Sequence, residues 1–153
     1  MQSRIMVDAD ACPVKKRDHP AGAQYGAAVW MIASYDHRLS EHAGVQVVQV
    51  DSSDQSVDLY IANRIHPRDV LVTQDFGLAA IGLGKGAVAI SNRGQIYDNA
   101  TIEFLLDTRH NQARKRRSGK HTKGPKPFTE EDRKHFLQNL TKVLTTLQEN
   151  ETL

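Results

Sequence analysis

Five short runs rich in valine, isoleucine and alanine recur along the chain, and stretches with helical spacing lie between most of them. The runs cover residues 5–7, 27–33, 45–50, 70–73 and 87–90. Apolar runs that alternate with helices are typical of a mostly parallel sheet with both faces covered. We therefore predict an α/β three-layer sandwich with a mostly parallel central sheet, in which residues 5–7 form the central strand.

Helices are predicted over residues 56–65, 77–83 and 101–107, the last of these extending toward His110, and most clearly over 129–148. Thr129 is a suitable N-cap for the last helix, and Asp132 occupies the reciprocal position of a capping box. The apolar residues of this helix recur at helical spacing and form one stripe. They are Phe136, Leu137, Leu140, Val143, Leu144 and Leu147. We expect this C-terminal amphipathic helix to pack on the domain or on a partner.

The size and composition favour one soluble domain spanning residues 1–153. A chain of 153 residues can bury most of its unfolded surface, and 39% of its residues are apolar. No apolar run approaches the roughly 20 residues of a membrane helix, and the N-terminus lacks a signal-peptide pattern. Because Cys12 is the single cysteine, a disulfide framework and a cysteine-based zinc site are excluded. We expect a cytoplasmic protein without membrane association, whose oligomeric state stays open.

The charge is distributed unevenly. Residues 1–108 hold 9 Lys/Arg and 13 Asp/Glu, whereas residues 109–129 hold 8 Lys/Arg and no acid. Such a run is either a solvated loop or a surface for a polyanion. We predict an exposed basic loop over residues 109–128, which could follow the phosphate backbone of RNA or DNA. The candidate contacts are Arg114, Lys115, Arg116, Arg117, Lys120, Lys123 and Lys126.

Acidic residues stand where the predicted strands end. Asp8 and Asp10 follow the first strand, and Asp75 closes the run VLVTQD. Ligands of an open parallel sheet bind beyond the carboxyl ends of its strands. Carboxylates that converge there repel one another unless a cation is bound, and hard oxygen ligands suit Mg²⁺ or Mn²⁺. Asp51 and Asp54 are better explained as turn or cap residues.

Other candidate sites are weaker. The glycines of GLGKG (residues 82–86) follow a helix and precede a strand, which is the reverse of a dinucleotide-binding loop, so they are predicted to serve turns and caps. His37 and His42 lie five residues apart in a predicted loop or short helix, a weak spacing for a metal pair. Cys12 has no neighbouring pattern typical of a thiolate nucleophile.

Several motifs occur in order over residues 5–143. They are VDADACPVK, SYDHRLSE, DLYIANRI, DVLVTQDFGLA, SNRGQIY and RRSGKHTKGPKPFTEEDR. Together they resemble the YaiI/YqxD family of uncharacterised bacterial proteins. That family is related to PIN-like domains, a group of α/β folds that includes metal-dependent ribonucleases. The resemblance therefore implies a PIN-like fold.

PIN-like nucleases place one Asp after the first strand, one in the helix before the fourth strand, and one directly after that strand. Asp8, Asp58 and Asp75 match these positions, and Asp10 is the second acid of VDADACP. The resemblance implies that these four residues hold one or two Mg²⁺ or Mn²⁺ ions. It also implies that Thr73 supports the ligands.

The sequence departs from the PIN pattern at two points. An acid from an early helix is common in PIN nucleases, and Asp18 is the single counterpart that can be suggested here. Pro20, Gly22 and Gly26 also disfavour a regular first helix. The missing acid favours a non-catalytic protein with the same fold, and the irregular stretch concerns the shape of the cleft at the strand ends.

We expect a metal-dependent phosphodiesterase that acts on RNA or DNA. One alternative is a non-catalytic RNA-binding protein with a PIN-like fold. Another is a phosphatase of the haloacid-dehalogenase type, whose first motif is also Asp-x-Asp after an apolar strand. In this chain Ala11 replaces the usual Thr or Val of that motif, and VTQDF supplies one Asp where that family has a later acidic pair.

Overall fold

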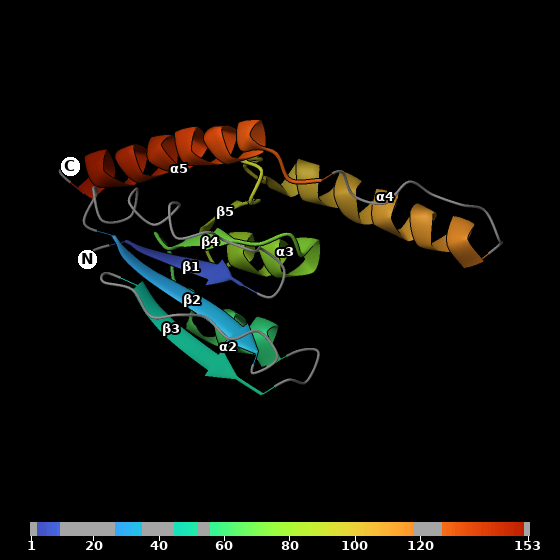
Figure 1. The fold of residues 1–153 in the computed structure, drawn as a ribbon, viewed down its shortest axis with the longest axis horizontal. Coiled ribbons are helices and arrows are strands. Elements are labelled where there is room, and N and C mark those ends of the chain that lie inside the picture. The colour runs from blue at the N-terminus through green and yellow to red at the C-terminus, as the bar shows by residue number, and fades with distance from the viewer. Residues whose placement is uncertain (1–2, 10–26, 35–44, 52–55, 118–126, 152–153) are drawn as a thin grey trace.

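The computed structural model describes residues 3–9, 27–34, 45–51, 56–117 and 127–151. Within these residues, five strands form one sheet (Figure 1). They are β1 (Arg4–Asp8), β2 (Ala28–Ser34), β3 (Val45–Val50), β4 (Val70–Val72) and β5 (Val88–Ile90). The spatial order is β3-β2-β1-β4-β5, and all neighbouring pairs are parallel. The predicted parallel sheet and its central strand are confirmed.

Two helices cover one face of this sheet. They are α2 (Ser56–Arg64), between β3 and β4, and α3 (Phe76–Gly84), between β4 and β5. Both connections run in the same direction across the sheet, so right-handed crossovers place both helices on the same face. Met6, Ile32 and Leu71 point to that face and pack against residues of α2 and α3. Of the glycines predicted to serve turns and caps, Gly86 lies in the turn after α3 with φ of 86°, whereas Gly82 lies inside α3 and is buried against Leu71.

The opposite face is covered by α5 (Glu130–Glu151). Successive side chains of a strand point to opposite faces, so Ile5 and Val7 of β1 face away from Met6. They pack against the apolar stripe of α5 together with Val72 and other strand residues. The buried members of the stripe are Phe136, Leu140, Val143 and Leu144. The helices on both faces give the predicted three layers.

The first turn of α5 carries the predicted capping box. The Thr129 N–H donates to Asp132 Oδ2 at 3.0 Å, and the Asp132 N–H donates to Thr129 Oγ1 at 3.1 Å. The bond from the Thr129 N–H, with a smaller attraction from Arg93, lowers the pKa of Asp132. Both residues therefore satisfy N–H groups that the start of a helix leaves without partners.

The remaining described helix, α4 (Asn99–Arg117), is longer than predicted. Asp98 precedes it and accepts a hydrogen bond from the Thr101 N–H at 2.7 Å, which lowers the pKa of Asp98. The prediction of a basic loop was wrong over residues 109–117, because that stretch is helical. Arginine, lysine, glutamine and alanine are good helix formers, and cations are favoured near a helix C-terminus. In the described part of the chain, no helix has the length and apolarity needed to cross a membrane.

A partly buried ion pair between Arg4 and Asp69 ties β1 to the start of β4 at the amino edge of the sheet. Asp69 is 4% exposed and receives two hydrogen bonds from Arg4, at 3.2 Å from Nε and 2.8 Å from Nη2. The His66 N–H donates to the same carboxylate at 2.8 Å. Arg4 also donates to the Arg64 carbonyl oxygen at 2.7 Å and thereby contacts the end of α2. The Asp69 carboxylate thus connects β1, the turn at His66 and the start of β4.

Candidate active site

The candidate site lies where the direction of strand addition reverses. From β1 the chain proceeds to β2 and β3 on one side, and it then crosses to β4 and β5 on the other. Ligands of open α/β sheets bind at such a switch point, beyond the carboxyl ends of the strands. Asp8 is the last residue of β1, and Thr73 directly follows β4. These two adjacent strand ends define the site.

One buried hydroxyl group joins the two strand ends. Thr73 is 0% exposed and Asp8 is 2% exposed. Thr73 Oγ1 donates to Asp8 Oδ2 at 2.8 Å and accepts from the Asp75 N–H at 3.0 Å. The Tyr97 hydroxyl donates to the Thr73 carbonyl oxygen at 3.4 Å. The Thr73 Oγ1 atom therefore hydrogen-bonds both the Asp8 side chain and the backbone of Asp75.

Asp75 is also the N-cap of α3. Its Oδ1 accepts hydrogen bonds from the Gly77 N–H at 2.9 Å and the Leu78 N–H at 3.2 Å. Its Oδ2 makes no hydrogen bond with the described residues. The side chain thus has a structural role through one oxygen, while the other oxygen can take a ligand.

The remaining predicted acids have different outcomes. Asp58 lies in the first turn of α2, the helix before β4, and is half-buried. No group of three or more His, Cys, Asp or Glu that could hold a metal ion occurs among the described residues, so Asp8, Asp58 and Asp75 do not form one by themselves. Asp10, the fourth predicted ligand, lies outside the described residues, as do Asp18, Cys12, His37 and His42.

A second polar pair at this edge was not predicted. The Gln74 Nε2 group donates to Asn92 Oδ1, which joins the residue between Thr73 and Asp75 to the segment that follows β5. Asn92 is 7% exposed. The Thr73 N–H also donates to the Ile90 carbonyl oxygen at 3.1 Å, so the two chain segments stay paired beyond their strands. The dipeptide Ser-Asn after an apolar strand was the available signal, because buried polar groups need partners.

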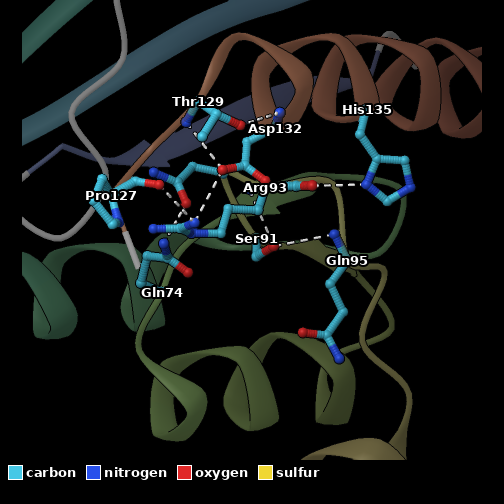
Figure 2. A network of polar contacts seen from close by, with 9 residues as sticks. Gln74, Ser91, Arg93, Gln95, Pro127, Thr129, Asp132 and His135 are labelled. Atoms are coloured by element: carbon cyan, nitrogen blue, oxygen red, sulfur yellow. Dashed lines mark hydrogen bonds and ion pairs between the residues drawn. The ribbon is translucent and has the colours of Figure 1, made fainter. Parts of the chain in front are cut away.

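The turn that follows β5 is ordered by Ser91. Its Oγ accepts hydrogen bonds from the Arg93 N–H at 3.2 Å and the Gln95 N–H at 3.0 Å. Gly94 in this turn has φ of 93°, a conformation that favours glycine. The turn directs Arg93 toward the beginning of α5, as Figure 2 shows.

Arg93 anchors α5 at this edge. Its Nη1 donates to Asp132 Oδ2 at 3.0 Å and to the Pro127 carbonyl oxygen at 3.3 Å (Figure 2). His135 Nδ1 lies 2.8 Å from the Arg93 carbonyl oxygen, so this nitrogen is the donor. Asn139 Nδ2 donates to the Gly94 carbonyl oxygen at 2.6 Å. These contacts fix the helix that covers one face of the sheet beside the candidate site.

The predicted nucleic-acid contacts lie at the end of α4 and beyond it. Arg114, Lys115, Arg116 and Arg117 occupy the last helical positions, and their side chains lie outside the described part of the structure. Lys120, Lys123 and Lys126 belong to a segment that is also outside it. Figure 1 shows that α4 extends past α3 on the side toward which the strands of the sheet point.

The sequence comparisons identify the family. Residues 6–146 match the family described as "Uncharacterized BCR, YaiI/YqxD family". The chain belongs to the YaiI/YqxD family. The family resemblance drawn from the motifs is therefore confirmed.

Relatives of this YaiI/YqxD-family chain are similar over nearly their whole length. The UPF0178 protein BH1374 of Halalkalibacterium halodurans is 44% identical over 141 residues, which cover 92% of this chain and 90% of the relative. A UPF0178 protein of Clostridium tetani is 44% identical over 137 residues, or 90% of this chain and 93% of the relative. Among solved structures, Rae1 (YacP) from Bacillus subtilis aligns with 94% of this chain and 99% of its own, at 17% identity and a TM-score of 0.45.

Proposed function

We propose that this protein is a divalent-metal-dependent phosphodiesterase that acts on RNA or DNA. The observation that carries the proposal is the position of Asp8, Thr73 and Asp75 at the switch point of a parallel sheet. Asp8 is a buried acid whose Oδ2 is held by the Thr73 hydroxyl group. Its position at the edge where α/β sheets bind ligands favours a role in ligand binding.

The donors suit Mg²⁺ or Mn²⁺. Mg²⁺ is typically held by one or two carboxylates, water and substrate phosphate oxygens, so Asp8 and the open oxygen of Asp75 are an adequate protein contribution. Asp10 would add to this set, as the PIN-like resemblance implies, whereas Asp58 is not included because Asp8, Asp58 and Asp75 do not form a metal-holding group. When bound, the ion would supply an activated water for in-line attack and stabilise the leaving oxygen.

The chain's own residues would orient these ligands. Thr73 would fix the Asp8 carboxylate through its hydroxyl proton and hold the backbone of Asp75 through its lone pair. The N-cap bonds of Asp75 would fix its χ1 angle while leaving Oδ2 for the ligand. Such positioning lowers the cost of arranging the reacting groups.

A nucleic acid is the favoured substrate because of the charge distribution. The segment of residues 109–129 holds 8 Lys/Arg without an acid, whereas residues 1–108 are net acidic and would repel phosphates. The end of α4 extends on the same side as the carboxyl ends of the strands (Figure 1). Cations at that end could hold a phosphate backbone that reaches the candidate site.

The test compares cleavage of a labelled oligonucleotide by the parent and by Asp75→Asn. Asparagine is as good an N-cap as aspartate, so this change removes a carboxylate while keeping the cap of α3. The parent should cleave in Mn²⁺ or Mg²⁺ and not in EDTA, and Asp75→Asn should lose cleavage while oligonucleotide binding is retained. Asp98→Asn is the matched control, because Asp98 caps α4 and should leave cleavage unchanged. Cleavage by Asp75→Asn at the parent's rate would contradict the assigned site.

Two further measurements separate the alternatives. An ion that binds only the folded state should raise the melting temperature, by an amount equivalent to about 2.7 kcal/mol at one hundred times its Kd. Oligonucleotide binding without cleavage or metal stabilisation would favour the non-catalytic RNA-binding protein. Hydrolysis of a chromogenic phosphomonoester in Mg²⁺ would favour the phosphatase.

A further inference from the structure

The most exposed large apolar side chain in the described part of the protein is Phe104 of α4, at 69%. Its neighbours Ile102, which is 4% exposed, and Leu105 pack with α3 residues in one apolar cluster. One face of α4 therefore packs against α3, and the Phe104 side chain lies outside that packed face. The ring of Phe104 is therefore free of the packing between α3 and α4 and is available to contact a ligand.

The helical register relates Phe104 to the basic end of α4. Residues four, seven and eleven positions later continue the same face of an α-helix. These are positions 108, 111 and 115. Asn111 is exposed, and the Thr108 hydroxyl donates to the Phe104 carbonyl oxygen at 2.9 Å. Position 115 lies within the run of four cations at 114–117. One face thus leads from an aromatic ring through an exposed amide to a cationic helix end.

We infer that this face of α4 binds single-stranded nucleic acid, with Phe104 stacking on a base and the run 114–117 contacting phosphates. The inference rests on the nucleic-acid part of the proposed function and names the form of the substrate. Proteins that bind single strands combine a basic track with aromatic side chains on which bases stack. A paired and stacked duplex offers no free base face to such a ring.

The surroundings of Phe104 favour a base over other partners. Glu103 and Asp107 are exposed beside Phe104, and Asp107, three positions later, shares its side of the helix, so phosphates are disfavoured there while a neutral base is not. A second copy of the chain or a protein partner would need a continuous apolar area, typically about 800 Å² of buried surface on each partner. A single ring flanked by acids and amides does not provide that area.

The test measures binding of the full-length protein to a single-stranded oligonucleotide of about 12 nucleotides, a length within known single-strand site sizes. Fluorescence anisotropy is recorded in EDTA, so that no cleavage occurs. An abasic oligomer of the same length carries the same phosphates without bases. Phe104→Ala should weaken binding of the base-bearing strand by about 5- to 140-fold, the range for loss of one stacked base, and leave the abasic strand unaffected.

Two substitutions at the same position isolate stacking from hydrophobicity. Phe104→Trp should retain binding, and its indole fluorescence should be quenched by the base-bearing strand and not by the abasic one. Phe104→Leu keeps an apolar side chain without a flat ring, so it should lose binding as Phe104→Ala does. Leu59→Ala, at a residue 57% exposed on α2, is the matched surface control and should bind as the parent.

A variant with alanine at 114–117 tests the phosphate track independently. It should weaken both strands and reduce the dependence of binding on salt, because fewer counterions are released. The preference for the base-bearing strand should persist in this variant, since Phe104 is intact.

The inference is overturned if the parent binds base-bearing and abasic strands equally, or if Phe104→Leu binds as the parent. It is also overturned if Phe104→Ala changes the oligomeric state while oligonucleotide binding is unchanged, because a second copy then occupies the face. Failure of the proposed function gives a different result. In that case Mn²⁺ cleavage by the parent is absent while the Phe104-dependent binding remains.

Discussion

Replacing Thr73 with valine removes a single hydroxyl group from the centre of the candidate site and keeps the shape of the side chain. In the parent, that hydroxyl donates to Asp8 Oδ2 and accepts from the Asp75 N–H. The Asp8 carboxylate, 2% exposed, therefore loses one of its donors without gaining water. The N–H of Asp75 loses its acceptor at the same time.

The expected cost follows from these two losses. A hydrogen bond to a charged group contributes about 1.5–3 kcal/mol, and a buried group left without a partner costs about 1–3 kcal/mol. Because valine gains some apolar burial, we expect Thr73→Val to lower the free energy of unfolding by about 2–4 kcal/mol. For a chain of this size, that corresponds to a fall in melting temperature of about 5–15 °C.

Urea unfolding followed by circular dichroism measures this difference, and two further variants assign it. Thr73→Ser keeps the hydroxyl and loses one methyl group, so it should cost about 1 kcal/mol. In an Asp8→Asn background, valine at position 73 should cost less than in the parent, because a neutral amide is a weaker acceptor than a carboxylate. If the destabilisation of the Asp8→Asn, Thr73→Val double variant equals the sum of the two single-variant values within about 0.5 kcal/mol, a direct link between Thr73 and Asp8 is refuted. Equal stabilities of the valine and serine variants would refute it as well.

Further predictions concern the anchoring of α5. Gly94→Ala should destabilise the fold by at least about 2 kcal/mol in urea unfolding. The added Cβ would lie 2.8 Å from backbone atoms of His135. Overpacking and a positive φ at a residue other than glycine each cost about 1–3 kcal/mol. Gly84→Ala, whose Cβ would have nothing within 4 Å, is the control and should be neutral or stabilising. The pKa of Asp132 is lowered in the fold, so its carboxylate contributes stability that is present above its ordinary value of 3.8 and lost as the pH falls through the lowered pKa. Comparing the parent with Asp132→Asn across that window should show a stability difference that vanishes at the acidic end, and a difference that is independent of pH would contradict the assignment.

Features that depend on nearby residues were predictable from the sequence. The five strands follow from valine and isoleucine runs, and their parallel arrangement follows from the helices between them. The capping box of α5 spans three residues, so both members were visible in the sequence. Asp8 and Asp75 could be placed at one edge because the carboxyl ends of parallel strands meet there.

Features that depend on distant pairing were not predictable. Arg93 and His135 are separated by 42 positions, and Gln74 and Asn92 by 18. Nothing in the local pattern of either residue specifies its partner, because polar side chains carry no periodic signal until the fold brings them together. The helical stretch over 109–117 was missed for a related reason, since a helix whose residues are nearly all polar has no apolar face to reveal it.

The last helix also sets an order of events during synthesis. The sheet face formed by Ile5, Val7 and Val72 packs against α5, and the 22 residues of that helix follow all the described strands of the sheet. At about 5–20 residues per second, they are translated over roughly one to four seconds after the preceding residues. During that interval a nascent chain can pair all five strands while the α5-facing side of its sheet still lacks that helix. The α5-facing side of the sheet is therefore open to aggregation and to chaperone binding until α5 has been synthesised.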